Sequence, residues 1–164
     1  MRRDHPIVLA GAIVGVLDIL AAFGVRAAFT GSARPMLVLQ GIASGLLGPA
    51  AFRGGVTTAA LGLLLHFFIA FVVAAVYYAL SRRWRVLVRR AVLCGVVYGV
   101  LVHTVMNQVV LPLSRVPLRT PPLSFTATMI LVHMVLVGLP VALTVKWADR
   151  AGAERRPAER VGPC

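Results

Sequence analysis

Four ionisable residues stand inside long apolar runs of this sequence, and their types could do chemistry there. They are Asp18, His66, His103 and His133. An ionisable side chain inside a membrane-crossing helix is costly, so it usually faces other helices or water rather than lipid. We therefore predict that these four side chains turn inward at a shared level and form one polar cluster.

Three kinds of chemistry suit such a cluster. The side chains could hold helices together by hydrogen bonds, each contributing about 0.6 kcal/mol on average in a membrane. They could carry a proton or small cation, since histidine gains and loses its proton near neutral pH. Three His and one Asp could also bind a metal, or the histidines a haem, although no single helix carries two of them at ligand spacing. These three interpretations stay open.

Motifs that accompany enzymatic catalysis are missing from the sequence. It has no Gly-x-Ser-x-Gly element, no phosphate-binding loop, no His-Glu-x-x-His element and no paired carboxylates in its apolar runs. No catalytic residue is assigned, and we expect a protein that is not an enzyme and that needs no cofactor.

The composition indicates the elements that must position the cluster. Of 164 residues, 59% are apolar and 13% are charged, whereas soluble domains carry about 25% charged residues. A soluble enzyme, a disordered chain and a disulfide-rich domain are thereby excluded. Each long apolar run is near the ~20 residues with which a helix crosses the hydrocarbon layer. We predict an all-α membrane four-helix bundle with spans at about 7–28, 56–80, 91–111 and 125–147.

A fifth apolar stretch, 36–52, is interrupted by Gln40, Ser44, several glycines and Pro49. It makes a poor full span, so we predict a re-entrant or interfacial helix on the outer side of the membrane. Gln40 is a secondary candidate site residue, because interrupted helices line permeation sites in some transporters. A lid lying on the surface is the alternative.

Positive charge predicts the threading. The net charge is +12, but the basic residues stand between apolar runs, which favours a topology signal over nucleic-acid binding. With four crossings and the N-terminus inside, twelve Lys and Arg residues face the cytoplasm and five face out. If 36–52 also crossed, the basic segment 82–90 would face out. We therefore predict four crossings with both termini in the cytoplasm. As partners we expect membrane lipids, and another copy of this chain or another membrane protein.

Small residues share helix faces with the polar ones. Gly11 and Gly15 lie one turn apart on the face of Asp18, and Gly95 and Gly99 precede His103 in the same way. Such faces allow close helix approach. Asn107 follows on the His103 face and is the other secondary candidate. The first two long spans resemble the last two in these patterns, which suggests a parallel duplication of a two-helix unit. The whole of 1–148 is predicted to be one transmembrane domain, followed by a disordered basic tail, 149–164.

Several short runs resemble a group of small four-span proteins of the bacterial inner membrane. They include Val38–Gly45, Leu61–Phe67, Val110–Ser114 and Val137–Pro140. More distantly, the layout is similar to the YagU family, whose name is linked to acid resistance. The resemblance implies a location in the bacterial inner membrane, and a role in acid stress would suit a titratable Asp and His cluster. It carries over no functional residues.

Overall fold

A computed structural model describes residues 5–117 and 121–158, and every element within these ranges is helical. The elements follow in the order α1 (His5–Thr30), α2 (Pro35–Leu47), η1 (Gly48–Arg53), α3 (Gly55–Arg83), α4 (Val86–Arg89), α5 (Ala91–Val105), η2 (Met106–Val110), α6 (Leu111–Leu113), α7 (Leu123–Val132), η3 (His133–Gly138) and α8 (Leu139–Ala158). The first of the η segments is a 3₁₀ helix, and η2 and η3 are π-helical. The predicted all-α class is confirmed.

In the described residues, five helices are long and apolar enough to cross a membrane. Four of them cover the predicted spans and extend some of them by a few residues. The fifth, Pro35–Arg53, combines α2 with η1 and has 19 residues, slightly more than the predicted segment 36–52. Length and composition alone therefore admit this segment as a span as well.

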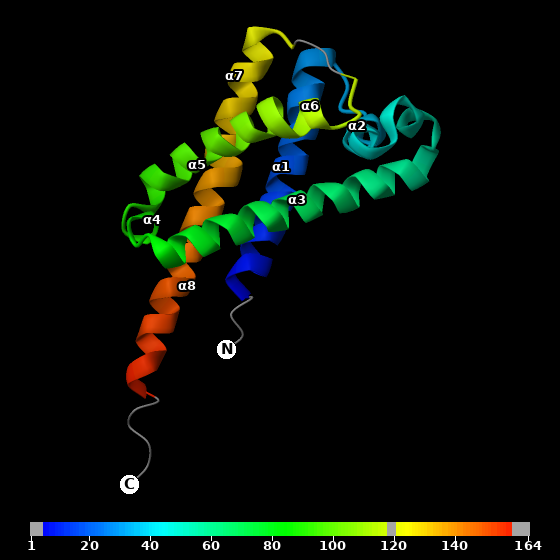
Figure 1. Cartoon of the computed structure of the whole chain (residues 1–164). Coiled ribbons are helices and arrows are strands. Elements are labelled where there is room, and N and C mark those ends of the chain that lie inside the picture. Colours follow the sequence, from blue (N-terminus) through cyan, green and yellow to red (C-terminus); the bar gives the residue numbers. More distant parts are fainter. Residues whose placement is uncertain (1–4, 118–120, 159–164) are drawn as a thin grey trace.

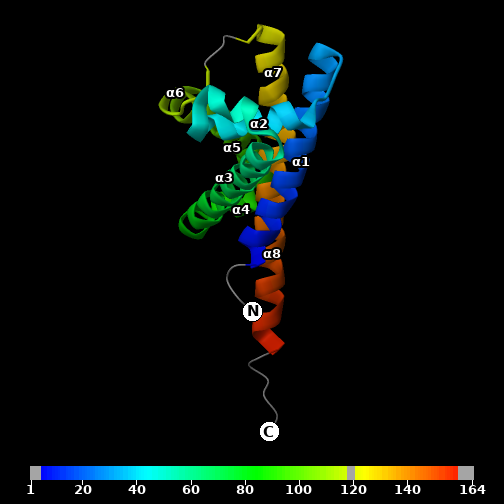
Figure 2. The ribbon, with the colours of Figure 1, turned by 90° about the vertical axis from the view of Figure 1, so that its right-hand side faces the viewer.

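The long helices form two pairs, and one pair crosses the other at a steep angle. A regular four-helix bundle is therefore not confirmed. In both views, α1 lies beside the continuous helix of α7, η3 and α8, and the two run in opposite directions (Figures 1 and 2). α3 and α5 pass across this pair at a large angle (Figure 1). A regular bundle would instead keep all helices about 20° from parallel.

The short segment lies across one end of the molecule. α2 packs against α3 and passes across the upper part of α1 in Figure 2. Gly62 of α3 makes this crossing close, because a Cβ there would collide with the carbonyl group of Leu39. The backbone N–H of Arg115 donates to the Gly45 carbonyl oxygen over 3.0 Å. The connection after α6 is thus joined directly to α2.

Each π-helical segment ends two residues before a proline. η2 precedes Pro112, and η3 precedes Pro140. Proline has no backbone N–H, and its ring collides with the carbonyl of the residue four positions earlier in an α-helix. A wider turn avoids that collision, which accounts for both segments. In the fourth predicted span the wider turn therefore lies just before Pro140.

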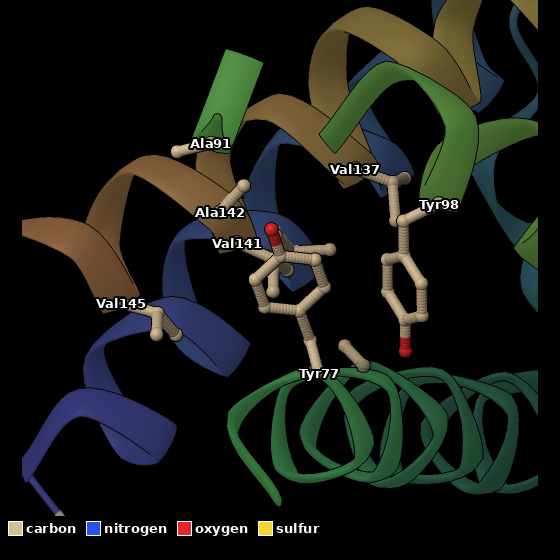
Figure 3. Close-up of a cluster of buried hydrophobic side chains, with 9 residues drawn as sticks. Tyr77, Ala91, Tyr98, Val137, Val141, Ala142 and Val145 are labelled. Carbon is tan, nitrogen blue, oxygen red and sulfur yellow. The ribbon is translucent and has the colours of Figure 1, made fainter. Parts of the chain in front are cut away.

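A compact group of buried side chains joins α1, α3, α5 and α8 (Figure 3). At its centre the rings of Tyr77 and Tyr98 meet edge to face, with centroids 4.9 Å apart. The Tyr98 hydroxyl donates to the Val73 carbonyl oxygen over 2.7 Å, and the Tyr77 hydroxyl donates to that of Leu87 over 3.0 Å. These bonds tie α3 to α5 and to α4.

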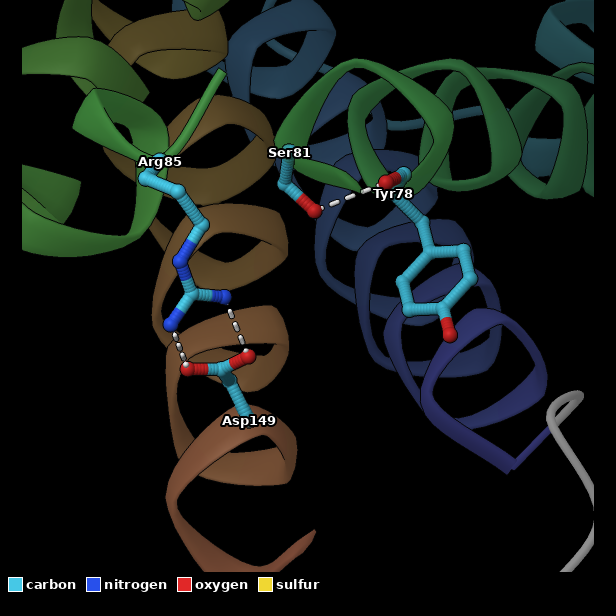
Figure 4. A network of polar contacts seen from close by, with 4 residues as sticks. All are labelled: Tyr78, Ser81, Arg85 and Asp149. Atoms are coloured by element: carbon cyan, nitrogen blue, oxygen red, sulfur yellow. Dashed lines mark hydrogen bonds and ion pairs between the residues drawn. The ribbon is translucent and has the colours of Figure 1, made fainter. Parts of the chain in front are cut away.

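α8 is tied to the segment before α4 by an ion pair. The two terminal guanidinium nitrogens of Arg85, Nη1 and Nη2, donate to the Asp149 carboxylate over 2.8 and 3.1 Å (Figure 4). These hydrogen bonds and the negative charge of Asp149 raise the pKa of Arg85 above its ordinary value. We expected a disordered tail from 149 onward. Instead α8 continues to Ala158, and the remainder of that predicted tail, 159–164, lies outside the described residues.

Candidate functional site

His66 joins α3 to α1. Its Nε2 atom lies 2.8 Å from the carbonyl oxygen of Gly15. Because a carbonyl oxygen only accepts hydrogen bonds, Nε2 carries the hydrogen. The helices meet closely here, since a Cβ at Gly15 would lie 2.6 Å from the Phe67 ring and one at Gly11 would collide with Phe71. The predicted small-residue face of α1 is therefore confirmed as a helix contact.

His103 and His133 form a second polar contact, between α5 and η3. Their rings meet edge to face with centroids 5.0 Å apart, and His103 is only 8% exposed. Glycines on both helices permit this approach. A Cβ at Gly99 would collide with the His133 carbonyl group, and one at Gly138 would collide with the backbone of Gly95 and Gly99.

Hydrogen bonds within each helix orient these two histidines. The Nδ1 atom of His133 lies 2.7 Å from the Met129 carbonyl oxygen, so Nδ1 carries its hydrogen. The Asn107 side-chain amide donates to the His103 carbonyl oxygen over 2.9 Å and lies 3.4 Å from His103 Nε2. Nε2 of His103 therefore accepts, and the hydrogen of the neutral ring is on Nδ1.

Asp18 belongs to neither contact. Its Oδ1 atom is buried and has no hydrogen-bond partner in the part of the chain that the structure describes. The same is true of Nδ1 of His103. Since buried polar atoms are nearly always paired, both are unusual. Asp18 lies one helical turn beyond Gly15, on the α1 face that packs against α3.

The predicted single cluster is thus divided. The structure brings His103 together with His133 and Asn107, whereas His66 binds the α1 backbone and Asp18 binds none of them. The reason is that His66 faces α1 while His103 faces η3, on a different side of the assembly. Within residues 5–117 and 121–158, no three Asp, Glu, His or Cys side chains are close enough to hold a metal ion. The metal alternative therefore has no ligand set there.

Gln40 fastens α2 to the start of α3. It is 2% exposed, and its side-chain amide donates to the Gly55 carbonyl oxygen over 3.1 Å and lies 3.4 Å from Thr58 Oγ1. Thr58 in turn donates to the Ala51 carbonyl oxygen over 2.7 Å. This network holds the turn between η1 and α3, where Gly55 adopts a φ of +56°.

Sequence reasoning missed two residues that organise these contacts. Tyr77 was not a candidate residue, but it is fully buried. The sequence did offer a sign of this. Tyr77 and Tyr98 both lie inside predicted spans, and a buried tyrosine hydroxyl usually needs a hydrogen-bond acceptor. Gly138 was not a candidate residue either, although a glycine inside a span also marks close helix packing.

No protein-family model, curated protein or solved structure matches this chain.

Proposed function

We propose that this chain is an integral protein of the bacterial inner membrane that crosses four times and acts without catalysis, by interaction or assembly. One observation carries the proposal. His66, which is costly to bury in a helix that crosses a membrane, is used to bind the backbone of a neighbouring helix at Gly15. His133 and Asn107 likewise bind carbonyl oxygens of their own helices. Polar side chains used in this way stabilise a scaffold.

The arrangement of the ends supports the proposed threading. The start of α1 and the far part of α8 lie toward one end, α2 and α6 lie toward the other, and α4 lies between them beside the α7–α8 helix (Figures 1 and 2). The basic segment 82–90 is joined through Arg85 to Asp149, on the part of α8 that leads to this first end, which supports a cytoplasmic position for it. Since α2 lies across the opposite end, it suits an interfacial helix on the outer side.

Thiol labelling tests the threading. In a Cys94→Ser variant, Cys164 is the remaining thiol. We expect it to resist a membrane-impermeant maleimide on intact spheroplasts and to react after lysis. Labelling of intact spheroplasts would place the C-terminus outside and contradict the proposed threading.

Proton flux tests the proposed role. The alternative, a proton or small-cation pathway, is supported by the unpartnered Oδ1 of Asp18 and Nδ1 of His103. The purified protein would be placed in vesicles that contain a pH-sensitive dye. A scaffold gives no flux above that of empty vesicles, and its His66→Gln variant changes only in stability. A flux that Asp18→Asn abolishes and Asp149→Asn retains would favour the pathway instead.

A further inference from the structure

A shallow, open groove of about 280 Å³ lies on the surface between α1 and α8. Leu9 lines it from α1, and Leu143, Thr144 and Trp147 line it from α8. Leu143 is 46% exposed and Trp147 61% exposed. An aromatic ring and two leucines therefore face whatever surrounds the helices at this place.

The side chains along α8 follow the polarity of a bilayer. Leu143, Trp147 and Arg150 are four and three residues apart, so they lie on one helix face. At 1.5 Å per residue they cover about 10 Å along the helix axis. In the proposed threading this order runs from the acyl chains through the aromatic boundary zone to the cytoplasmic headgroups.

The charges near the groove select an anion. Asp149, the acidic neighbour of Arg150, is already bound by Arg85 at 2.8 Å. Arg150 is exposed, and Lys146 is half-buried on the turn before it. A phosphate group near Arg150 would therefore meet positive charge, as anionic headgroups do at basic segments beside a membrane.

We propose that this groove binds one anionic phospholipid of the cytoplasmic leaflet. An acyl chain lies along Leu9 and Leu143, the glycerol region lies beside Trp147, and the phosphate lies near Arg150. This site rests on the threading proposed above, which puts the end of α8 in that leaflet. Binding would fix the orientation of α1 and α8 relative to the membrane.

The two tryptophans of the chain make the site measurable. A Trp84→Phe variant reports only on Trp147, and a Trp147→Phe variant reports only on Trp84. Trp84 is a stringent control, because it is 53% exposed and follows Arg82 and Arg83 but does not line the groove. Each variant would be placed in phosphatidylcholine vesicles that contain a small fraction of either brominated phosphatidylglycerol or brominated phosphatidylcholine, and quenching would be compared.

We expect brominated phosphatidylglycerol to quench Trp147 as if enriched about fivefold over brominated phosphatidylcholine, the factor that one basic side chain near an anionic surface supplies. Trp84 should show a smaller preference. Arg150→Gln should remove most of the Trp147 preference, and Arg83→Gln should leave it. An equal preference at both tryptophans, or one unaffected by Arg150→Gln, would overturn the site while leaving the threading intact. Absence of quenching of Trp147 by both lipids would instead overturn the placement of α8 in the bilayer, on which the site rests.

Discussion

The Nε2 atom of His66 lies 2.8 Å from the carbonyl oxygen of Gly15, and this bond joins the middle of α3 to the middle of α1. Next to this bond, the Phe67 ring packs against Gly15 at the position that a Cβ would occupy. A polar contact and an apolar contact thus occupy adjacent positions on the same helix crossing. Their contributions to stability can be separated by substitution.

Gly15→Ala should destabilise the protein by about 1–3 kcal/mol, the usual cost of overpacking a close contact. The added Cβ would lie 2.6 Å from the Phe67 ring. Thermal unfolding in detergent, followed by circular dichroism, measures the change. Gly24→Ala is the matched control on the same helix, because a Cβ there meets nothing within 4 Å. Equal unfolding temperatures for the two variants would contradict the described α1–α3 crossing.

Gly138→Ala should be more damaging than Gly15→Ala. The new methyl group would collide with backbone atoms of Gly95 and Gly99, which cannot rotate away as a phenylalanine ring can. We expect a loss of about 3 kcal/mol, measured in the same unfolding experiment. Separation of α5 from η3 should also loosen the contact between His103 and His133. Gly41→Ala, where a Cβ also meets nothing within 4 Å, should retain wild-type stability.

Tyr98→Phe removes the hydrogen bond to the Val73 carbonyl oxygen and should cost about 1 kcal/mol. The ring itself still packs against Tyr77, so the effect isolates the hydroxyl group. Denaturation by guanidinium in detergent would report the difference. Tyr78→Phe serves as the comparison, since the half-buried Tyr78 lies one position from Tyr77 and its hydroxyl contacts none of the residues drawn beside it (Figure 4). A larger loss for Tyr78→Phe than for Tyr98→Phe would be inconsistent with this geometry.

Asp149→Asn should weaken the attachment of α8 to the segment before α4 without unfolding the chain. The Arg85–Asp149 pair is exposed, with side chains 58% and 25% accessible, so dissolved salt screens it. We expect faster hydrogen exchange in the last turns of α8 at low ionic strength, and a difference from wild type that shrinks as salt is added. A difference that grows with salt would rule out an electrostatic attachment.

The small-residue faces were predictable because spacing along a helix fixes which residues share a face. Gly11 and Gly15 therefore lie at a helix crossing as expected. Which helix each face meets was not predictable. His66 lies on α3 and His103 on α5, and both helices cross the pair of α1 and α7–α8 at a large angle, so the first side chain meets α1 and the second meets η3. Such crossings depend on contacts between helices, such as Gly15 against Phe67, which no single segment reveals.

A third pair of glycines, in α2, also shows what spacing alone does not predict. Gly41 and Gly45 are spaced like the other pairs, yet a Cβ at Gly41 would meet nothing within 4 Å and one at Gly45 would make only ordinary contacts. α2 packs on α3 with another face, which carries Gln40 and Ala43. Spacing alone cannot distinguish a glycine that allows close packing from one that does not.

The hydrogen bond from the Arg115 N–H to the Gly45 carbonyl couples two connections that are far apart in the sequence. Any swing of α2 away from α3 has to carry the chain after α6 with it or break that bond. α2 and the connection after α6 would consequently move as one piece.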